Sequence, residues 1–370
     1  MTRPLHIVQC LSALSYGGSE LATVELAEGL LAAGHRLTLI AAGGALSPRC
    51  RAAGIELLEW PLGRKHPASL LWIRRLRRWL SENSVDVLHA QARLPAWLAW
   101  LAWRGMPAGQ RPAWVTTIHG QYSPGAYSRI MASGERVIAV STAMAQWARR
   151  LDPGCDERLR VVYGGVDPQS YYPGFRPTDD WLRCFDEQWP GLRQRPTISL
   201  VARGTRLKNH AGLIRLIAAL RQRGMAVDGL VIGGFSRRRQ HYLQELQGLA
   251  SELGVAGQIH YLGDREDVRE LMAVSSLVIN ISNKAEAFGR TLLEALALGR
   301  PVVSWDRGGA SEILARLYPP GAVPADDEAA LVERCLRILD DPLPVVADNP
   351  FILSRTYADT LACYAELVES

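Results

Sequence analysis

The chain alternates short apolar segments with segments of helical periodicity, and this alternation occurs in two successive series. The strand-like runs of the first series are residues 5–10, 35–40, 85–89, 114–119, 136–140 and 159–163. Those of the second are residues 197–201, 229–232, 258–262, 277–280 and 301–304. Strands that alternate with helices form βαβ units around a parallel sheet. The sequence therefore predicts an α/β fold of two Rossmann-like domains, with a ligand cleft between them.

The places where the alternation of strands and helices is interrupted suggest the domain limits. Residues 1–170 form the first domain and residues 197–348 the second. The segment 171–196 is rich in Pro and Gly, which predicts a linker with one short helix near Trp181–Trp189. We expect residues 349–370 to form a final helix that packs back toward the first domain. A length of 370 residues fits two domains, because single cores rarely grow beyond about 250–300 residues.

Composition narrows the classes of protein. The six cysteines lie far apart without a C-x-x-C pair, which argues against a zinc site or a disulfide scaffold and fits a reducing cytoplasm. No apolar run approaches the roughly 18–20 residues of a membrane span. The apolar run near the N-terminus leads straight into Gly17 and Gly18, so it predicts a first buried strand rather than a signal peptide.

Charge is unevenly distributed. The net charge is +7 over residues 1–170 and −2 over residues 171–370. The basic half suits an anionic partner such as a membrane surface, nucleic acid or a phosphorylated glycan. We find no recognition motif for nucleic acid, so a nucleic-acid-binding protein is the weakest of these readings.

Two carboxylates, Glu286 and Glu294, give the strongest chemical signal. Glu286 lies in a loop after a buried strand, and Glu294 lies one turn into the following helix. Backbone N–H groups at such a helix start suit a phosphate, and the carboxylates suit the hydroxyl groups of a ribose and a sugar. The alternative is a helix start at which acidic residues are favoured by the dipole alone.

Three further features follow strands. Arg203 and Lys208, five residues apart, suit a diphosphate, whereas Arg206 between them reads as a surface residue. Gly17 and Gly18 after the first strand allow close approach of a ligand to the backbone. His119 at a strand end either faces the substrate or is a structural histidine.

No Asp-x-Asp motif is present, so the usual acidic bridge between a metal and a diphosphate is missing. Arg203, Lys208 and helix N-termini would then meet the charge of a leaving diphosphate. We therefore expect neither a metal nor another cofactor.

In this order, the residues resemble the retaining nucleotide-sugar glycosyltransferases of family 4, which have the GT-B fold. The resemblance spans roughly residues 5–320. It rests on Glu286 and Glu294 with Phe288-Gly289 between them, the segment 295–303, and the upstream Arg203 and Lys208. The segment 282–290 also resembles bacterial cell-envelope members, including lipopolysaccharide core transferases.

The resemblance implies a role for each site residue. Glu286 would bind hydroxyls of the transferred sugar and His119 would contact that sugar near the reacting carbon; these are the catalytic candidates. Donor binding would fall to Gly17, Gly18, Arg203, Lys208, Asp264, Arg265, Phe288, Gly289, Arg290, Thr291 and Glu294. Within this set, Glu294 would hold the ribose and the nucleobase would lie near Asp264 and Arg265.

The implied activity is transfer of a hexose-type sugar, with uridine as the expected base, to a glycan or lipid-linked acceptor. The family's front-face mechanism requires no side-chain base. One departure is Gly164-Gly165-Val166-Asp167, where the family often has Asn in the first position. That departure leaves open a second hypothesis, a non-catalytic module that binds a nucleotide-sugar or glycan.

Residues 70–80 are basic and amphipathic, with Trp72, Ile73, Leu76, Trp79 and Leu80 able to share one face. Such a helix suits peripheral contact with the cytoplasmic face of an inner membrane. The alternative is an ordinary helix whose apolar face lies in the core.

Overall fold

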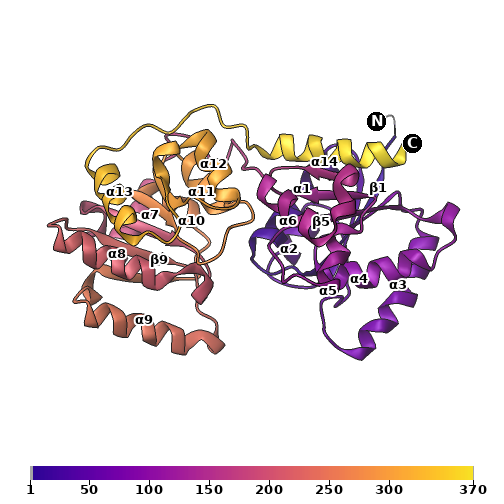
Figure 1. The fold of residues 1–370 in the computed structure, drawn as a ribbon, viewed down its shortest axis with the longest axis horizontal. Coiled ribbons are helices and arrows are strands. Elements are labelled where there is room, and N and C mark those ends of the chain that lie inside the picture. Colours follow the sequence, from indigo (N-terminus) through magenta and orange to yellow (C-terminus); the bar gives the residue numbers. More distant parts are fainter. Residues whose placement is uncertain (1–2, 370) are drawn as a thin grey trace. The chain divides into compact units, whose positions relative to one another are not determined.

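The computed structural model describes residues 3–369, and its contacts divide the chain into two compact units. Unit 1 consists of the residues up to Gly165 together with those from Phe351 onward, and unit 2 runs from Val166 to Pro350. The predicted outer limits at residues 1 and 370 lie outside the described residues. Each unit is built on a parallel sheet with helices on its faces (Figure 1).

The sheet of unit 1 has seven strands in the order β3-β2-β1-β4-β5-β6-β7, all paired in parallel. The strands are β1 (His6–Ala13), β2 (Arg36–Ala42), β3 (Glu56–Glu59), β4 (Val87–Ala90), β5 (Ala113–Ile118), β6 (Arg136–Ala139) and β7 (Leu159–Val161). The helices are α1 (Gly18–Ala32), α2 (Ser47–Ala52), α3 (Leu71–Glu82), α4 (Arg93–Arg104), α5 (Ala126–Arg129), α6 (Thr142–Leu151) and α14 (Leu353–Val368).

The C-terminal helix α14 packs beside α1 on one face of this sheet (Figure 1). Cys363 and Tyr364 of α14 join the core that α1 and the central strands form. A methyl group at Gly29 of α1 would overlap the ring of Tyr357, with only 2.2 Å between the two carbons, so Gly29 permits this close approach. The final helix is therefore an integral part of unit 1.

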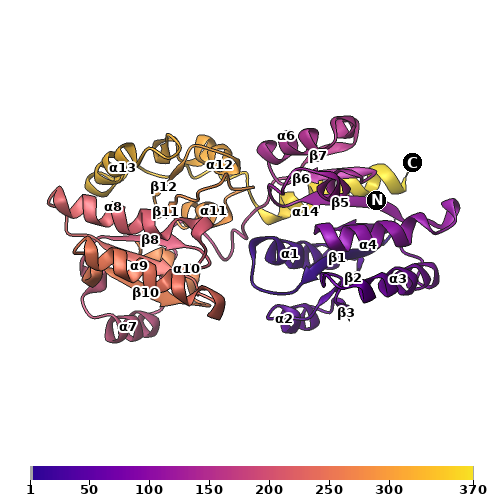
Figure 2. The same cartoon turned by 60° about the horizontal axis from the view of Figure 1, so that its bottom comes forward.

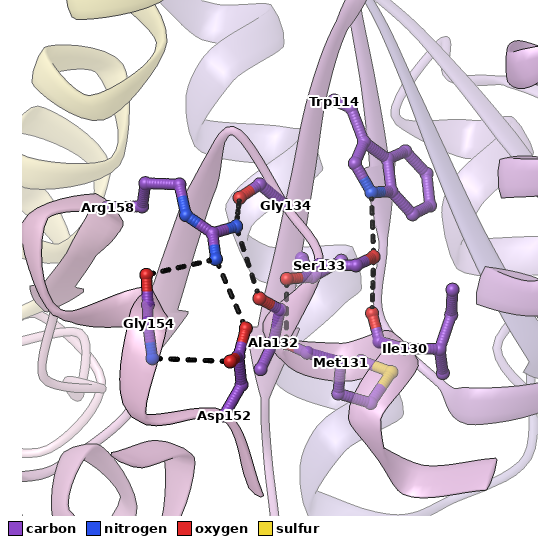
Figure 3. Close-up of polar contacts among 10 residues, drawn as sticks. Trp114, Ile130, Met131, Ala132, Ser133, Gly134, Asp152, Gly154 and Arg158 are labelled. Carbon is purple, nitrogen blue, oxygen red and sulfur yellow. Dashed lines mark hydrogen bonds and ion pairs between the residues drawn. The ribbon is translucent and has the colours of Figure 1, made fainter. Parts of the chain in front are cut away.

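Side-chain hydrogen bonds to backbone carbonyls hold the connection between β5 and β6 (Figure 3). Arg158 donates from Nη1 to the carbonyls of Ala132 and Gly134, at 3.3 and 2.6 Å, and pairs with Asp152 at 3.2 Å. The indole N–H of the buried Trp114 donates to Ser133 Oγ at 3.1 Å. These bonds satisfy polar groups that the turn would otherwise leave unpaired.

The sheet of unit 2 has six strands in the order β10-β9-β8-β11-β12-β13, again all parallel. Figure 2 labels β10, β8, β11 and β12 of this sheet. The strands are β8 (Thr197–Val201), β9 (Asp228–Ile232), β10 (Ile259–Gly263), β11 (Leu277–Asn280), β12 (Val302–Trp305) and β13 (Ala322–Val323). The helices are α7 (Asp179–Gln188), α8 (His210–Gln222), α9 (Gln240–Glu252), α10 (Val268–Val274), α11 (Arg290–Ala297), α12 (Gly309–Leu317) and α13 (Glu328–Asp340).

The segment 171–196, for which Pro and Gly predict a linker, lies within unit 2. Its helix α7 places Phe185 in a buried cluster with Leu230 and Leu271, and Leu192 joins the same cluster. Apolar residues between the prolines therefore anchor this segment to the sheet. The change of unit comes earlier than residue 170, between Gly165 and Val166.

Helix α3 turns most of its apolar face inward. Leu76 and Leu80 are buried, and the Trp72 ring stacks on Trp60 with 5.5 Å between centroids. The apolar face of α3, for which the sequence suggests contact with a membrane, therefore packs largely into the core. At the start of α3, Leu71 keeps 69% of its surface exposed. Among the described residues, no helix has the length and apolar character to cross a membrane.

Candidate active site

The topology of each sheet identifies one edge as the place for a ligand. In an open parallel sheet, ligands bind beyond the carboxyl ends of the strands where the strand order reverses. In unit 2 that reversal lies between β8 and β11, and in unit 1 it lies between β1 and β4. The loops that leave these strands carry most of the residues singled out from the sequence.

In unit 2 the two loops meet in an ion pair. Lys208, in the single turn of 3-10 helix after β8, donates from Nζ to Glu286 Oε1 at 2.5 Å. Ser282 Oγ donates to the same carboxylate oxygen at 2.6 Å. The side chains of Lys208 and Glu286 are 25% and 21% exposed. A ligand at this edge would therefore meet a cation and a carboxylate that the fold already holds together.

The environment keeps Glu286 ionised. Burial acts to raise the pKa of this carboxyl, but the charge and hydrogen bond of Lys208 and the bonds from Ser282 and Asn280 outweigh it and leave the pKa lowered. A carboxylate in this state accepts hydrogen bonds from sugar hydroxyls.

Two asparagines, which sequence reasoning missed, fix the relative position of the two loops. Asn209 adopts the left-handed conformation with φ +56°, caps α8 through Gly212 N, and donates from Nδ2 to the Ile281 carbonyl at 3.2 Å. Asn283 donates to the Arg206 carbonyl at 2.8 Å, and its backbone N–H donates to the Leu207 carbonyl. An asparagine is a good residue for a left-handed cap, so Asn209 after Lys208 was the available signal.

The second carboxylate lies on α11. Glu294 is buried, and its Oε1 accepts from Arg290 Nε at 2.7 Å. The helix begins after Gly289, whose φ of +103° suits glycine, and this residue brings no side chain to cap the first turn. Phe288, Arg290 and Thr291 lie where the chain enters α11.

The helix α12 supports this loop from behind. The backbone N–H of Gly309 donates to the Glu286 carbonyl at 2.9 Å. A methyl group at Gly309 would lie 2.4 Å from the Ala287 carbonyl oxygen, so glycine is required for the loop to pack here. The conformation of the Glu286 backbone thus depends on the start of α12.

The cations of the β8 loop differ in their surroundings. Arg203 is exposed, and within residues 3–369 it has no acidic group at ion-pair distance. Arg206 pairs with Glu245 and covers the ring of Tyr242 at 4.7 Å, which confirms the surface reading of this residue. An unneutralised Arg203 on the same loop as Lys208 suits a ligand with two phosphate groups.

The loop after β10 carries the two residues assigned to the nucleobase region. Asp264 Oδ1 accepts from the backbone N–H of Gly234 at 2.8 Å and so joins the β9 and β10 loops. Arg265 pairs with Asp267 through two hydrogen bonds, at 2.7 and 2.6 Å. Both side chains are thus held within the loops at this edge.

In unit 1, His119 follows β5 at the corresponding edge. Its Nε2 lies 2.7 Å from Gln91 Oε1. An amide oxygen only accepts, so this nitrogen carries the proton and Nδ1 keeps its lone pair. Burial lowers the pKa of His119 to about 4, so the ring is neutral at pH 7. Gln91 was missed from the sequence because only its position after β4 points to it.

Gly17 and Gly18 lie at the same edge of unit 1, where β1 leads into α1. Gly17 has an extended backbone and caps the helix without a side chain. A methyl group on Gly17 would lie 2.4 Å from Glu20 Oε2, whereas Gly18 meets open space. This turn therefore exposes backbone at the carboxyl edge of the sheet.

No group of three or more His, Cys, Asp or Glu side chains in residues 3–369 is arranged to hold a metal ion. The chemical groups at the two edges are instead cations, carboxylates, one neutral imidazole and exposed backbone.

The family models describe the same two-part arrangement. Residues 16–170 match the model "Glycosyltransferase Family 4", and residues 186–349 match "Glycosyl transferases group 1". The chain is a family 4 glycosyltransferase. Its two parallel-sheet, Rossmann-like units are those of the GT-B fold, as the resemblance implied.

Curated relatives of this chain include glycosyltransferases from bacteria. The chain is 24% identical to N-acetyl-alpha-D-glucosaminyl L-malate synthase of Bacillus anthracis, over 88% of this chain and 86% of the relative. It is 26% identical to a GDP-mannose-dependent phosphatidylinositol monomannoside mannosyltransferase of Mycobacterium tuberculosis, over 75% of this chain and 74% of the relative.

Solved structures share the fold across nearly the whole chain. A glycosyltransferase from Rickettsia africae aligns with a TM-score of 0.84 and 24% identity, covering 99% of both chains. Anabaena HepE in complex with UDP-glucose aligns with a TM-score of 0.75 and 21% identity, covering 98% of this chain and 95% of that chain. WaaG, a glycosyltransferase of lipopolysaccharide biosynthesis, has a TM-score of 0.69 and 18% identity, covering 98% and 97%.

Proposed function

We propose that this glycosyltransferase moves a hexose-type sugar from a nucleotide-sugar to a glycan or glycolipid, with retention at the anomeric carbon. The observation that carries the proposal is the Lys208–Glu286 pair beside the unneutralised Arg203. Arg203 and Lys208 bind the diphosphate, Glu294 binds the ribose, and Glu286 binds hydroxyls of the transferred sugar. His119 of unit 1 contacts that sugar near its reacting carbon.

The reaction needs no metal and no resident cofactor in this proposal. The bond from the anomeric carbon to the diphosphate oxygen breaks as the bond to the acceptor oxygen forms on the same face. The proton of the acceptor hydroxyl passes to the departing diphosphate. Arg203 and Lys208 stabilise the negative charge that develops there.

Uridine is the proposed base and the bacterial cell envelope the proposed setting, with lipopolysaccharide core as the leading acceptor. HepE, crystallised with UDP-glucose, and WaaG, from lipopolysaccharide biosynthesis, support these choices through their shared fold. The GDP-mannose-dependent relative makes guanosine the alternative base.

The first experiment measures the thermal stability of the intact protein with UDP, GDP, ADP and their sugar conjugates. A ligand at about 100 times its Kd stabilises a protein by roughly 2.7 kcal/mol, which shifts the melting temperature visibly. A shift with uridine nucleotides alone supports the proposed donor. A shift with another base replaces it, and no shift with any of them contradicts the donor site.

The second experiment tests catalysis with Glu286→Ala. We expect this variant to keep its fold and lose sugar transfer. The matched control is Glu328→Ala, because Glu328 is an exposed carboxylate of unit 2 that pairs with Arg215. Wild-type turnover in Glu286→Ala would contradict the assigned role. Donor binding by the wild type without any product would favour the alternative, a non-catalytic module.

We further propose that the enzyme works on the cytoplasmic face of the inner membrane and touches it through the start of α3. Leu70 and Leu71 are 60% and 69% exposed, and Arg74 beside them is also exposed. Exposed apolar side chains next to cations suit an anionic bilayer. Leu71→Ser should weaken sedimentation with anionic vesicles, whereas Leu343→Ser, at an exposed leucine of unit 2, should not. Equal sedimentation of both variants and the wild type would contradict this contact.

A further inference from the structure

Arg93 of unit 1 lies between two tyrosine rings. It is the first residue of α4, directly after β4, and its side chain is partly buried. Its guanidinium carbon lies 4.7 Å from the Tyr122 ring centroid and 5.2 Å from that of Tyr127. Its Nη1 also donates to Ser128 Oγ at 3.2 Å. These contacts fix the position of the guanidinium group and leave most of its N–H donors for another partner.

No carboxylate neutralises this charge. Within residues 3–369, no acidic oxygen lies within ion-pair distance of Arg93, whereas Arg136 and Arg160 of the same unit both pair with Glu366. The charges of Glu20 and Arg93 act in opposite directions on the pKa of Tyr122. A partly buried cation without a counterion is unfavourable, so an anionic ligand would be bound strongly here.

The position of Arg93 links it to the catalytic candidate His119. Gln91, two residues before Arg93, holds the His119 ring through the 2.7 Å contact. Tyr122, three residues after His119, lies under the guanidinium group. Arg93, Gln91 and His119 thus share the carboxyl edge of β4 and β5, two strands that pair directly.

We infer that Arg93 binds an oxyanion, a phosphate or a carboxylate, carried by the acceptor. The inference rests on the proposed function, in which the donor diphosphate is bound in unit 2 by Arg203 and Lys208. The positive charge of Arg93 in unit 1 is then available to the acceptor. Tyr122 and Tyr127 hold the guanidinium plane and offer apolar ring surface to the rest of the acceptor.

Binding of glycerol 3-phosphate and glycerol to the intact protein tests this inference by calorimetry. The nucleotide that stabilises the protein is present at saturation, so that glycerol 3-phosphate cannot bind at the donor site. If no nucleotide stabilises the protein, the donor site of the proposed function is contradicted. Glycerol 3-phosphate is then titrated into Arg203→Gln, which lacks the donor-site arginine, so that the inference about Arg93 is still tested by itself. We expect glycerol 3-phosphate to bind and glycerol not to bind.

The variants Arg93→Gln and Arg93→Lys identify the residue. Loss of hydrogen bonds to a charged group corresponds to about a ten- to hundredfold loss of affinity, which we expect in Arg93→Gln but not in Arg93→Lys. The matched control is Arg104→Gln, because Arg104 lies at the other end of α4 and stacks on Trp100 at 4.7 Å. Equal affinity of the wild type and Arg93→Gln, or equal binding of glycerol and its phosphate, would overturn the inference.

A chemical footprint covers the case in which Arg93→Gln fails to fold. Glycerol 3-phosphate should protect Arg93 of the wild type from phenylglyoxal and leave Arg104 reactive. Unchanged labelling of Arg93 at saturating ligand would overturn the inference. A water-soluble short-chain phosphatidic acid in the same titration separates a lipid phosphate from a free sugar-like phosphate, and protection by either supports the oxyanion site.

Discussion

Removal of Lys208 should leave Glu286 as an uncompensated, mostly buried carboxylate. Breaking a fully buried ion pair costs about 3–5 kcal/mol, and exposed pairs contribute about 0–1 kcal/mol. The side chains of Lys208 and Glu286 are 25% and 21% exposed, and Ser282 still donates to Glu286. We therefore expect a coupling free energy between the two residues of about 1–3 kcal/mol.

A double-mutant cycle of Lys208→Met, Glu286→Gln and both together measures this coupling. Hydrogen exchange of peptides from β11 and α11 under mild denaturant reports the stability of unit 2 separately from unit 1. The matched control is the exposed pair Arg215–Glu328 of the same unit, for which we expect at most about 1 kcal/mol. Equal coupling in the two pairs would refute the view that burial gives the Lys208–Glu286 pair its strength.

The same coupling should depend on pH in a defined direction. The folded pKa of Glu286 lies below its ordinary value of 4.5. Its contribution to stability is therefore fully present above about pH 4.5 and is lost as the pH falls through the lower, folded pKa. Coupling that stays unchanged well below pH 4.5 would show that the carboxylate charge is not its source.

Three further predictions concern other described residues. Glu294→Gln should lose most of the stabilisation of roughly 2.7 kcal/mol that a saturating nucleotide gives the wild type, measured as a melting shift; an undiminished shift would remove Glu294 from the donor site. Tyr364→Phe should destabilise unit 1 by about 1–2 kcal/mol in hydrogen exchange, because the buried His89 Nδ1 loses its 2.7 Å hydrogen bond and keeps only the longer contact of 3.4 Å with Gln91 Nε2; an unchanged unit 1 would contradict this. Burial lowers the pKa of His89 to about 3 and of His119 and His210 to about 4, below the unfolded value of about 6.5. The contribution of each neutral histidine to the free energy of unfolding is fully present above about pH 6.5. It declines by about 1.4 kcal/mol per pH unit as the pH falls from there toward the folded pKa. A pH titration of unfolding checks this, and a flat profile between pH 6.5 and 4.5 would contradict it.

The sheets were predictable from sequence because their central strands are continuous apolar runs. The strands missed are β3, Glu56–Glu59, whose ends are charged, and β13, which has two residues. Both lie at sheet edges, where one side of the strand has no partner to bury it. The segment 171–196 was misread as a linker because its prolines mark turns, whereas its apolar side chains decide its packing.

Strand order also predicts which edge of each sheet carries the site. It does not predict which side chains contact one another there. Lys208 reaches Glu286 across 78 residues of the chain, and that spacing carries no sign of the contact. Arg93 shows the same limit, because its two tyrosine neighbours lie 29 and 34 residues further along the chain. Side-chain partners of this kind depend on loop conformation, which periodicity does not encode.

The two catalytic candidates are both poor bases at neutral pH, and this bears on the fate of the acceptor proton. A general base works best when its pKa lies near the working pH. The pKa of His119 is about 4, and the Glu286 carboxylate has a lowered pKa and is engaged by Lys208 and Ser282. The departing diphosphate is then the best available proton acceptor in the proposed mechanism. In that case, replacement of His119 by Gln, which also accepts hydrogen bonds, should lower turnover without moving the pH profile. A shift of the profile would instead identify His119 as the base.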